Sequence, residues 1–149
     1  METQVLISES YAEKYGRRNH YVGISIWHFE WCTKYRYKMF QKEEYRALLE
    51  ACVRRAASMH GIKFEELSVQ PDHVHCVARI SGTMSPSKAL QILKGVSSRL
   101  FFLNHEKARL RYPKGHLWSR GGTAVTVGYN QLSDTALYIL NQAKHHGLA

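Results

Sequence analysis

Apolar and polar residues alternate with a period of two along four stretches of the chain, and this alternation predicts four β-strands. The first stretch covers residues 21–30, and we expect this strand to continue to residue 38. Residues 62–69 alternate imperfectly, which is typical of a strand that contains a β-bulge. The third strand, residues 70–80, begins at a Pro71-Asp72 turn, and residues 124–128 form a short fourth strand.

Three other stretches place apolar residues at the spacing of an amphipathic helix. Residues 43–60 predict a helix that Gly61 ends as a C-terminal cap, and its apolar stripe consists of Tyr45, Leu48, Leu49, Cys52, Ala56 and Met59. A second helix follows the N-cap Ser85, with Pro86 as its first residue. The last helix begins at a Ser133 cap, and its apolar face consists of Ala136, Leu137, Ile139, Leu140 and Ala143.

The resulting order is strand, helix, strand, strand, helix, strand and a final helix, which is the order of a ferredoxin-like α+β sandwich. In this fold two helices pack on one face of a four-stranded antiparallel sheet, and a nucleic acid can lie on the other face. We expect a single domain over residues 1–149, in which residues 1–20 form a basic, poorly ordered arm.

The charge balance suggests the kind of partner, because 21 Lys and Arg residues outnumber 12 Asp and Glu and give a formal net charge of +9. Such an excess favours nucleic acid over an anionic membrane surface, although a merely basic surface has the same composition. The three cysteines are odd in number and widely spaced, so we expect reduced thiols in a cytoplasmic protein. We predict no membrane association, since the sequence has neither a spanning apolar run nor a signal-peptide core.

The third predicted strand carries two histidines on one side. His73 and His75 alternate with the apolar residues Val74, Cys76, Ala78 and Ile80. Imidazoles at positions i and i+2 of a strand lie close enough to bind one divalent ion together. The alternative is a surface strand that carries two histidines without a metal. A closed zinc site is a poorer hypothesis, because no pair of cysteines accompanies the histidines.

Two basic segments are candidates for contact with nucleic acid. In residues 34–38 three cations alternate with two tyrosines, so that cations can meet phosphates while rings stack on unpaired bases. An edge strand kept soluble by its charge would show the same pattern. Residues 105–122 are basic and rich in turns, and they suit a nucleic-acid contact better than a core. The residues that we expect to contact DNA are Arg17, Arg18, Lys34, Arg36, Lys38, Lys94, Arg111, Lys114 and Arg120.

On the last predicted helix, Tyr138 and Gln142 lie one turn apart on the face opposite the apolar stripe. Packing does not explain a tyrosine at this position beside an amide. Taken by itself, however, a surface tyrosine whose hydroxyl reaches water is the commoner case.

Four blocks of the sequence resemble the HUH single-tyrosine transposases, which are small DNA-nicking and DNA-joining enzymes of the IS200 group of insertion sequences. Residues 70–75, with the sequence Gln-Pro-Asp-His-Val-His, resemble the histidine–hydrophobe–histidine motif of this family. Residues 31–36, 117–119 and 138–142 are similar to three other family segments, in the family's order and at about its spacing. Two departures are Cys76, where members usually carry a bulkier aliphatic residue, and residues 120–123, which replace a stretch bearing proline and tyrosine.

The resemblance implies a metal-dependent homodimer that recognises hairpins near the ends of an insertion sequence and cuts single-stranded DNA. On this analogy His73 and His75 bind Mg²⁺ or Mn²⁺, Gln142 completes the metal site, and Tyr138 is the nucleophile that forms a 5′-phosphotyrosine intermediate. The tyrosine helix of one subunit can serve the histidines of the other. Two further readings stay open, namely a domesticated HUH nickase acting on repeated palindromes and a non-catalytic RNA-binding module. Against the RNA-binding module, no strand carries its aromatic pattern.

Overall fold

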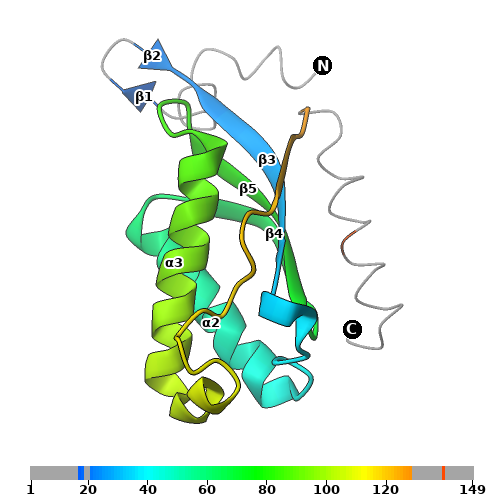
Figure 1. Cartoon of the computed structure of the whole chain (residues 1–149). Helices are drawn as coiled ribbons and strands as arrows, with labels where there is room; N and C mark the ends of the chain where they lie inside the picture. The colour runs from blue at the N-terminus through cyan, green and yellow to red at the C-terminus, as the bar shows by residue number, and fades with distance from the viewer. Residues whose placement is uncertain (1–16, 19–20, 129–138, 140–149) are drawn as a thin grey trace.

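The computed structural model describes residues 17–18, 21–128 and 139, and it confirms the ferredoxin-like α+β sandwich. Four antiparallel strands form the main sheet in the order β4-β5-β3-β6, and two long helices cover one face of it (Figure 1). The strands are β3 (Ile24–Cys32), β4 (Lys63–Val69), β5 (His73–Ser81) and β6 (Thr123–Thr126). The helices are α2 (Glu43–Met59) and α3 (Pro86–Asn104).

The central strands β3 and β5 determine which side chains share a face of the sheet. Their register pairs Glu30 with His75 and Cys32 with His73. Because side chains alternate along a strand, the apolar residues between and after the histidines point toward the helices. These residues, Val74, Cys76, Ala78 and Ile80, are fully buried with Phe29 and Trp31 of β3. The predicted division of the histidine strand into an apolar and a histidine-bearing side is therefore confirmed.

The predicted helix caps are also present. The Ser85 hydroxyl accepts a hydrogen bond from the Lys88 backbone N–H at 3.0 Å, at the start of α3. At the end of α2, Gly61 has a φ of +70°, and the Ile62 N–H donates to the Ala57 carbonyl at 2.9 Å, as in a Schellman cap. The prediction that Met59 is buried is wrong, since this last residue of the helix is 49% exposed.

The second and fourth strands follow the predicted pattern. The imperfect alternation of residues 62–69 corresponds to a register shift between Phe64 and Glu66, where β4 pairs with β5. The short strand β6 pairs with β3 and lies at one edge of the sheet, while β4 lies at the other.

The first strand differs from the prediction at both ends. Two strands of two residues each, β1 (Arg17–Arg18) and β2 (Tyr21–Val22), pair antiparallel before it. The other residues of the predicted arm lie outside the described residues. β3 ends at Cys32 instead of continuing to residue 38. The backbone N–H groups of Thr33 and Lys34 donate to carbonyls outside the sheet, and the chain then forms the 3₁₀ turn η1 (Lys34–Arg36).

Residues 105–122 contribute more to the core than the sequence indicates. The segment begins with a short 3₁₀ helix, η2 (Glu106–Leu110), and its Tyr112, Leu117 and Trp118 are buried. The Trp118 ring packs edge-on against Trp31 at a centroid distance of 5.8 Å. The prediction that this segment is a contact surface rather than core is therefore wrong for its aromatic residues.

A second, smaller buried cluster lies on the sheet face that α2 and α3 leave uncovered. It consists of Ile26, Val77, Val127 and Ile139. Ile139 is helical and fully buried, as predicted for the apolar face of the last helix. Ser133, Tyr138 and Gln142 of that predicted helix lie outside the described residues. Among the residues that the structure describes, no helix is long and apolar enough to cross a membrane.

Candidate metal centre

Three side chains that can bind a metal ion meet on the sheet face away from the helices. Glu30 comes from β3, and His73 and His75 come from the start of β5. One ligand atom from each of these residues lies within 4.8 Å of the other two. The cluster follows from the register, because β3 and β5 are hydrogen-bonded neighbours and Glu30 is paired directly with His75.

A carboxylate beside the cluster orients His73. Nδ1 of His73 lies 2.7 Å from Asp72 Oδ1, and Arg36 Nε donates to Asp72 Oδ2 at 3.2 Å. Burial alone would raise the pKa of Asp72, but the hydrogen bonds from His73 and Arg36 outweigh it and lower that pKa. The ionised Asp72 therefore accepts from Nδ1–H of His73, which leaves the lone pair for a metal on Nε2.

His75 is held from two sides and is only 2% exposed. Its Nε2 lies 3.2 Å from Glu30 Oε2, and its Nδ1 lies 3.4 Å from Nε2 of His28. The His28 and His75 rings stack with a centroid distance of 5.6 Å. Burial lowers the pKa of His28 more than Glu30 raises it, which favours a neutral ring that can accept Nδ1–H of His75. In that tautomer, the lone pair of His75 is on the nitrogen beside Glu30.

The donor set fits the divalent ions predicted from the family resemblance. Imidazole nitrogens suit several transition metals, and a carboxylate oxygen suits Mg²⁺ and Mn²⁺, so two imidazoles with one carboxylate form a mixed set appropriate to Mn²⁺. Metal-binding histidines usually donate their second ring N–H to a neighbouring group, and Asp72 and His28 are placed to accept those protons. The residues that would bind the metal and the groups that orient them are therefore both present.

The structure confirms that the predicted histidines lie together and adds residues that the sequence did not indicate. Glu30 and His28 are absent from the predicted site, because their place depends on the pairing of β3 with β5. A weak signal does exist, since His28, Glu30 and Cys32 share the side of β3 opposite the buried Phe29 and Trp31. Gln142 and Tyr138, the other predicted site residues, lie outside the described residues.

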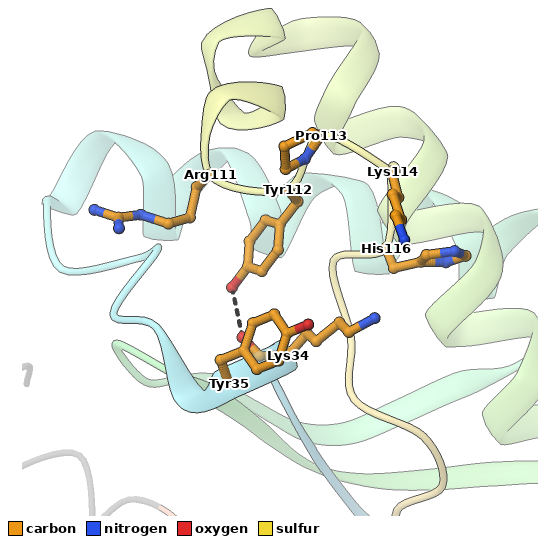
Figure 2. A pocket seen from close by; sticks show the side chains of 7 residues that line it. All are labelled: Lys34, Tyr35, Arg111, Tyr112, Pro113, Lys114 and His116. Atoms are coloured by element: carbon orange, nitrogen blue, oxygen red, sulfur yellow. Dashed lines mark hydrogen bonds between the residues drawn. The ribbon is translucent and has the colours of Figure 1, made fainter.

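Several of the predicted DNA-contacting cations line a pocket between η1 and the loop that follows η2 (Figure 2). We call it the η1 pocket, and its lining residues are Lys34, Tyr35, Arg111, Tyr112, Pro113, Lys114 and His116. Lys38 lines a neighbouring pocket that also includes Arg111. Lys34, Lys38, Arg111 and Lys114 thus lie in one region of the surface.

The other predicted cations have different surroundings. Arg36 forms the ion pair with Asp72, and the half-buried Lys94 donates hydrogen bonds to the carbonyls of Ser119 and Gly121. Lys94 therefore stabilises the loop before β6, and burial lowers the pKa of its ammonium group. Arg120 is exposed, whereas the side chains of Arg17 and Arg18 lie outside the described part of the chain.

A ferredoxin-like sheet carries a histidine pair and a carboxylate on its helix-free face, next to basic pockets, which is the arrangement that the resemblance to HUH single-tyrosine transposases predicts. Residues 22–142 match the family described as "Transposase IS200 like". The chain therefore belongs to the IS200-like transposases, as the four sequence blocks predict.

Two relatives show how far this similarity extends. The chain is 28% identical over 122 residues to the ISDra2 transposase TnpA of Deinococcus radiodurans, across 82% of this chain and 86% of the relative. It is 29% identical over 104 residues to the transposase for insertion sequence element IS200 of Salmonella typhimurium, across 70% of this chain and 68% of the relative.

Two solved structures share the fold. A Deinococcus radiodurans R1 protein, described as a candidate transposase, matches with a TM-score of 0.66 and 27% identity, over 85% of this chain and 96% of that protein. A REP-associated tyrosine transposase bound to a REP hairpin matches with a TM-score of 0.61 over 89% of this chain and 74% of its own. At 15% identity, the second similarity concerns the fold alone.

Proposed function

We propose that this transposase cleaves and rejoins single-stranded DNA at hairpins near the ends of an insertion sequence, in a reaction that depends on Mg²⁺ or Mn²⁺. The cluster of Glu30, His73 and His75 carries the proposal. It supplies three ligand atoms at mutually compatible distances, and a hydrogen-bond acceptor lies at the second ring nitrogen of each histidine.

A divalent ion at this cluster would neutralise the charge of the scissile phosphate and polarise its oxygens. The role of the protein is to hold the metal ligands in place before the DNA binds. Asp72 fixes the ring of His73, His28 fixes the ring of His75, and Glu30 adds a negative charge beside both histidines. Because these groups are already hydrogen-bonded to one another, little reorganisation is needed when substrate binds.

We assign the role of nucleophile to Tyr138. Its phenol oxygen attacks phosphorus while the bond from phosphorus to the 3′ oxygen breaks, and the phenol proton is passed on to that departing oxygen. The products are a 5′-phosphotyrosine and a strand that ends in a 3′-hydroxyl, so a second 3′-hydroxyl can reverse the step without ATP. The next residue, Ile139, supports this role, since it is buried against Ile26 and Val77 on the sheet face that also bears His75.

We further infer that Gln142 adds an amide oxygen to the metal site and that two chains form a homodimer. Gln142 follows Tyr138 by one turn of the predicted helix, so one rigid element would carry both groups. All four residues of the edge strand β6 are exposed, and Val125 is 51% exposed. An exposed edge strand can pair with its copy across a two-fold axis, which would also let the tyrosine helix of one subunit serve the other.

The substrate is inferred from charge and from the related fold. A formal net charge of +9 favours a polyanion as the partner. Three of the basic residues, Lys34, Arg111 and Lys114, line the η1 pocket near the end of β3, where they can contact phosphates. A hairpin is bound to the REP-associated transposase, which has the same fold.

The test is to incubate the protein with labelled single-stranded DNA from the flanks of its own gene, with Mg²⁺ or Mn²⁺ present. The wild type should form a covalent protein–DNA adduct that survives a denaturing gel. Tyr138→Phe should bind the hairpin but form no adduct, because it lacks only the attacking oxygen. Tyr129→Phe is the matched control and should still form the adduct. An adduct formed by Tyr138→Phe at the wild-type level would disprove the assignment.

A further inference from the structure

The η1 pocket lies at the end of the sheet that carries the metal ligands. Its residue Lys34 follows Cys32 by two positions, and Cys32 is paired with His73. The pocket has a volume of about 210 Å³, which is below the roughly 300–1,000 Å³ of sites for drug-sized ligands. A space of this size suits one base or phosphate group of a longer molecule better than an extended ligand.

Among the described residues, the basic side chains of the η1 pocket have no carboxylate partner. The side chains of Lys34, Lys114 and His116 extend toward the same side of the pocket, whereas Arg111 points away from it (Figure 2). Within the described part of the chain, none of these first three side chains forms a salt bridge or a side-chain hydrogen bond, and no carboxylate lines the pocket. Two ammonium groups beside an imidazole, which can donate an N–H, favour a phosphate.

Tyr35 provides a second, independent observation. Tyr35 is 69% exposed, and its backbone has a φ of 63°, a left-handed conformation that is rare and costly for a bulky residue. The next residue, Arg36, also has a positive φ, of 52°. The ring contacts Tyr37 at a centroid distance of 5.6 Å, and the Lys34 ammonium lies 5.4 Å from its centroid. The rest of the ring lies in solvent, so these two contacts alone do not explain the conformation. Backbone strain of this kind concentrates at ligand-binding and catalytic positions.

Hydrogen bonds from both flanks hold the strained turn. The Tyr112 hydroxyl donates to the Lys34 carbonyl at 3.0 Å, and the Thr33 hydroxyl donates to the Tyr37 carbonyl at 2.7 Å. Burial raises the pKa of Tyr112 to about 12, so its hydroxyl stays protonated and remains a donor at neutral pH. The structure thus keeps an aromatic ring exposed at the mouth of a cationic pocket.

We infer that the η1 pocket binds one unpaired nucleotide of the DNA substrate, with its phosphate among Lys34, Lys114 and His116 and its base stacked on the Tyr35 ring. This inference rests on the proposed function, which supplies single-stranded DNA as the substrate. The nucleotide must be unpaired, because a base within a duplex is already stacked on both faces. The site therefore distinguishes single-stranded DNA from duplex DNA next to the metal centre.

The test measures binding of a short oligothymidine that carries one 2-aminopurine, whose fluorescence is quenched when it stacks on an aromatic ring. Tyr35→Gly should bind it roughly 5- to 150-fold more weakly than the wild type, as expected for the loss of one base–aromatic stack. Tyr35→Phe should bind and quench like the wild type. The thermal midpoint of Tyr35→Gly should not fall, because glycine adopts a positive φ without strain.

The cation part of the site needs its own control. Lys114→Ala should weaken binding, because it removes one phosphate contact. The slope of log K against log salt should then become smaller in magnitude by about 0.7. Arg55→Ala removes one charge from the exposed surface of α2 and should leave the affinity almost unchanged. The inference is overturned if Tyr35→Gly binds and quenches like the wild type, if it unfolds, or if it loses affinity for duplex DNA to the same degree.

These measurements are made in EDTA, so that they do not depend on the metal centre or on cleavage. If the η1 pocket is assigned wrongly, Tyr35→Gly binds normally in EDTA, while metal-dependent adduct formation by Tyr138 is still observed. If the proposed chemistry is wrong, no adduct forms with Mg²⁺ or Mn²⁺. The affinity of Tyr35→Gly in EDTA then still tests whether the η1 pocket binds a nucleotide.

Discussion

Replacing Asp72 with alanine should weaken metal binding more than it weakens the fold. The substitution removes the carboxylate 2.7 Å from Nδ1 of His73, so that the tautomer and ring orientation of this ligand are no longer fixed. Loss of such an orienting partner typically reduces metal affinity by about 10- to 100-fold, or about 1.4–2.8 kcal/mol.

The expected cost to the fold is smaller. The ion pair that is lost involves an Arg36 side chain that is 62% exposed, and exposed pairs contribute about 0.2–1 kcal/mol. The backbone carbonyl of Asp72 still accepts from the Thr33 N–H at 2.9 Å in the variant, so the turn before β5 keeps its anchor. The hydrogen bond from His73 is lost as well, so the free energy of unfolding should fall by about 1–2 kcal/mol.

Calorimetric titration with Mn²⁺ measures the affinity, and urea denaturation without metal measures the stability. Glu50→Ala is the matched control, because it breaks an exposed pair in which Arg54 Nε lies 3.1 Å from a carboxylate remote from the cluster. This control should bind Mn²⁺ like the wild type. Wild-type affinity in Asp72→Ala would refute the reasoning, and an equal loss in Glu50→Ala would show that the effect is one of general stability.

Three other predictions concern DNA affinity, backbone strain and alkaline stability. Lys38→Ala should lower the salt slope of single-stranded DNA binding by about 0.7, and an unchanged slope in binding titrations would exclude a phosphate contact there. Gly122→Ala should lower the free energy of unfolding in urea titrations by roughly 1–3 kcal/mol, because its Cβ would lie 2.8 Å from the Glu30 carbonyl oxygen at a φ of +155°. The raised pKa of Tyr112, about 12 against an ordinary value of about 10, implies stability that is present below about pH 10 and lost as the pH rises toward 12. Tyr112→Phe should lose about 1 kcal/mol at neutral pH but show a flatter loss between pH 10 and 12 in urea titrations, and an unaltered alkaline profile would contradict this account.

Periodicity and capping residues were sufficient to predict most of the fold. The helix that follows Ser85 and the bulge in residues 62–69 depend on local sequence, and both are present. The extension of the first strand to residue 38 failed because tyrosine is not a turn-forming residue. Tyr35 adopts a positive φ only because hydrogen bonds from Thr33 and Tyr112, which are distant from each other in the sequence, hold the turn.

The metal centre could be predicted only in part, for a related reason. His73 and His75 are neighbours in one strand, so that the sequence alone brings them together. Glu30 and His28 join them through the register of β3 with β5, and a shift of one residue would turn both to the other face. Long-range pairing of this kind leaves little trace in the composition of either strand.

The metal ligands come from β3 and β5, the two strands with a hydrogen-bonded neighbour on each side. Amide hydrogens of β3 that bond to β5 should exchange with solvent only when the whole domain unfolds, whereas the outer strand β6 should open and close on its own. Native-state hydrogen exchange should therefore find slow amides at Phe29 and Trp31, whose backbone N–H groups face β5, and faster ones along residues 123–126. As a result, β6 can fray or change its pairing partner while β3 and β5 stay paired and keep the metal ligands in place. Thermal motion of the edge strand therefore leaves the metal centre intact.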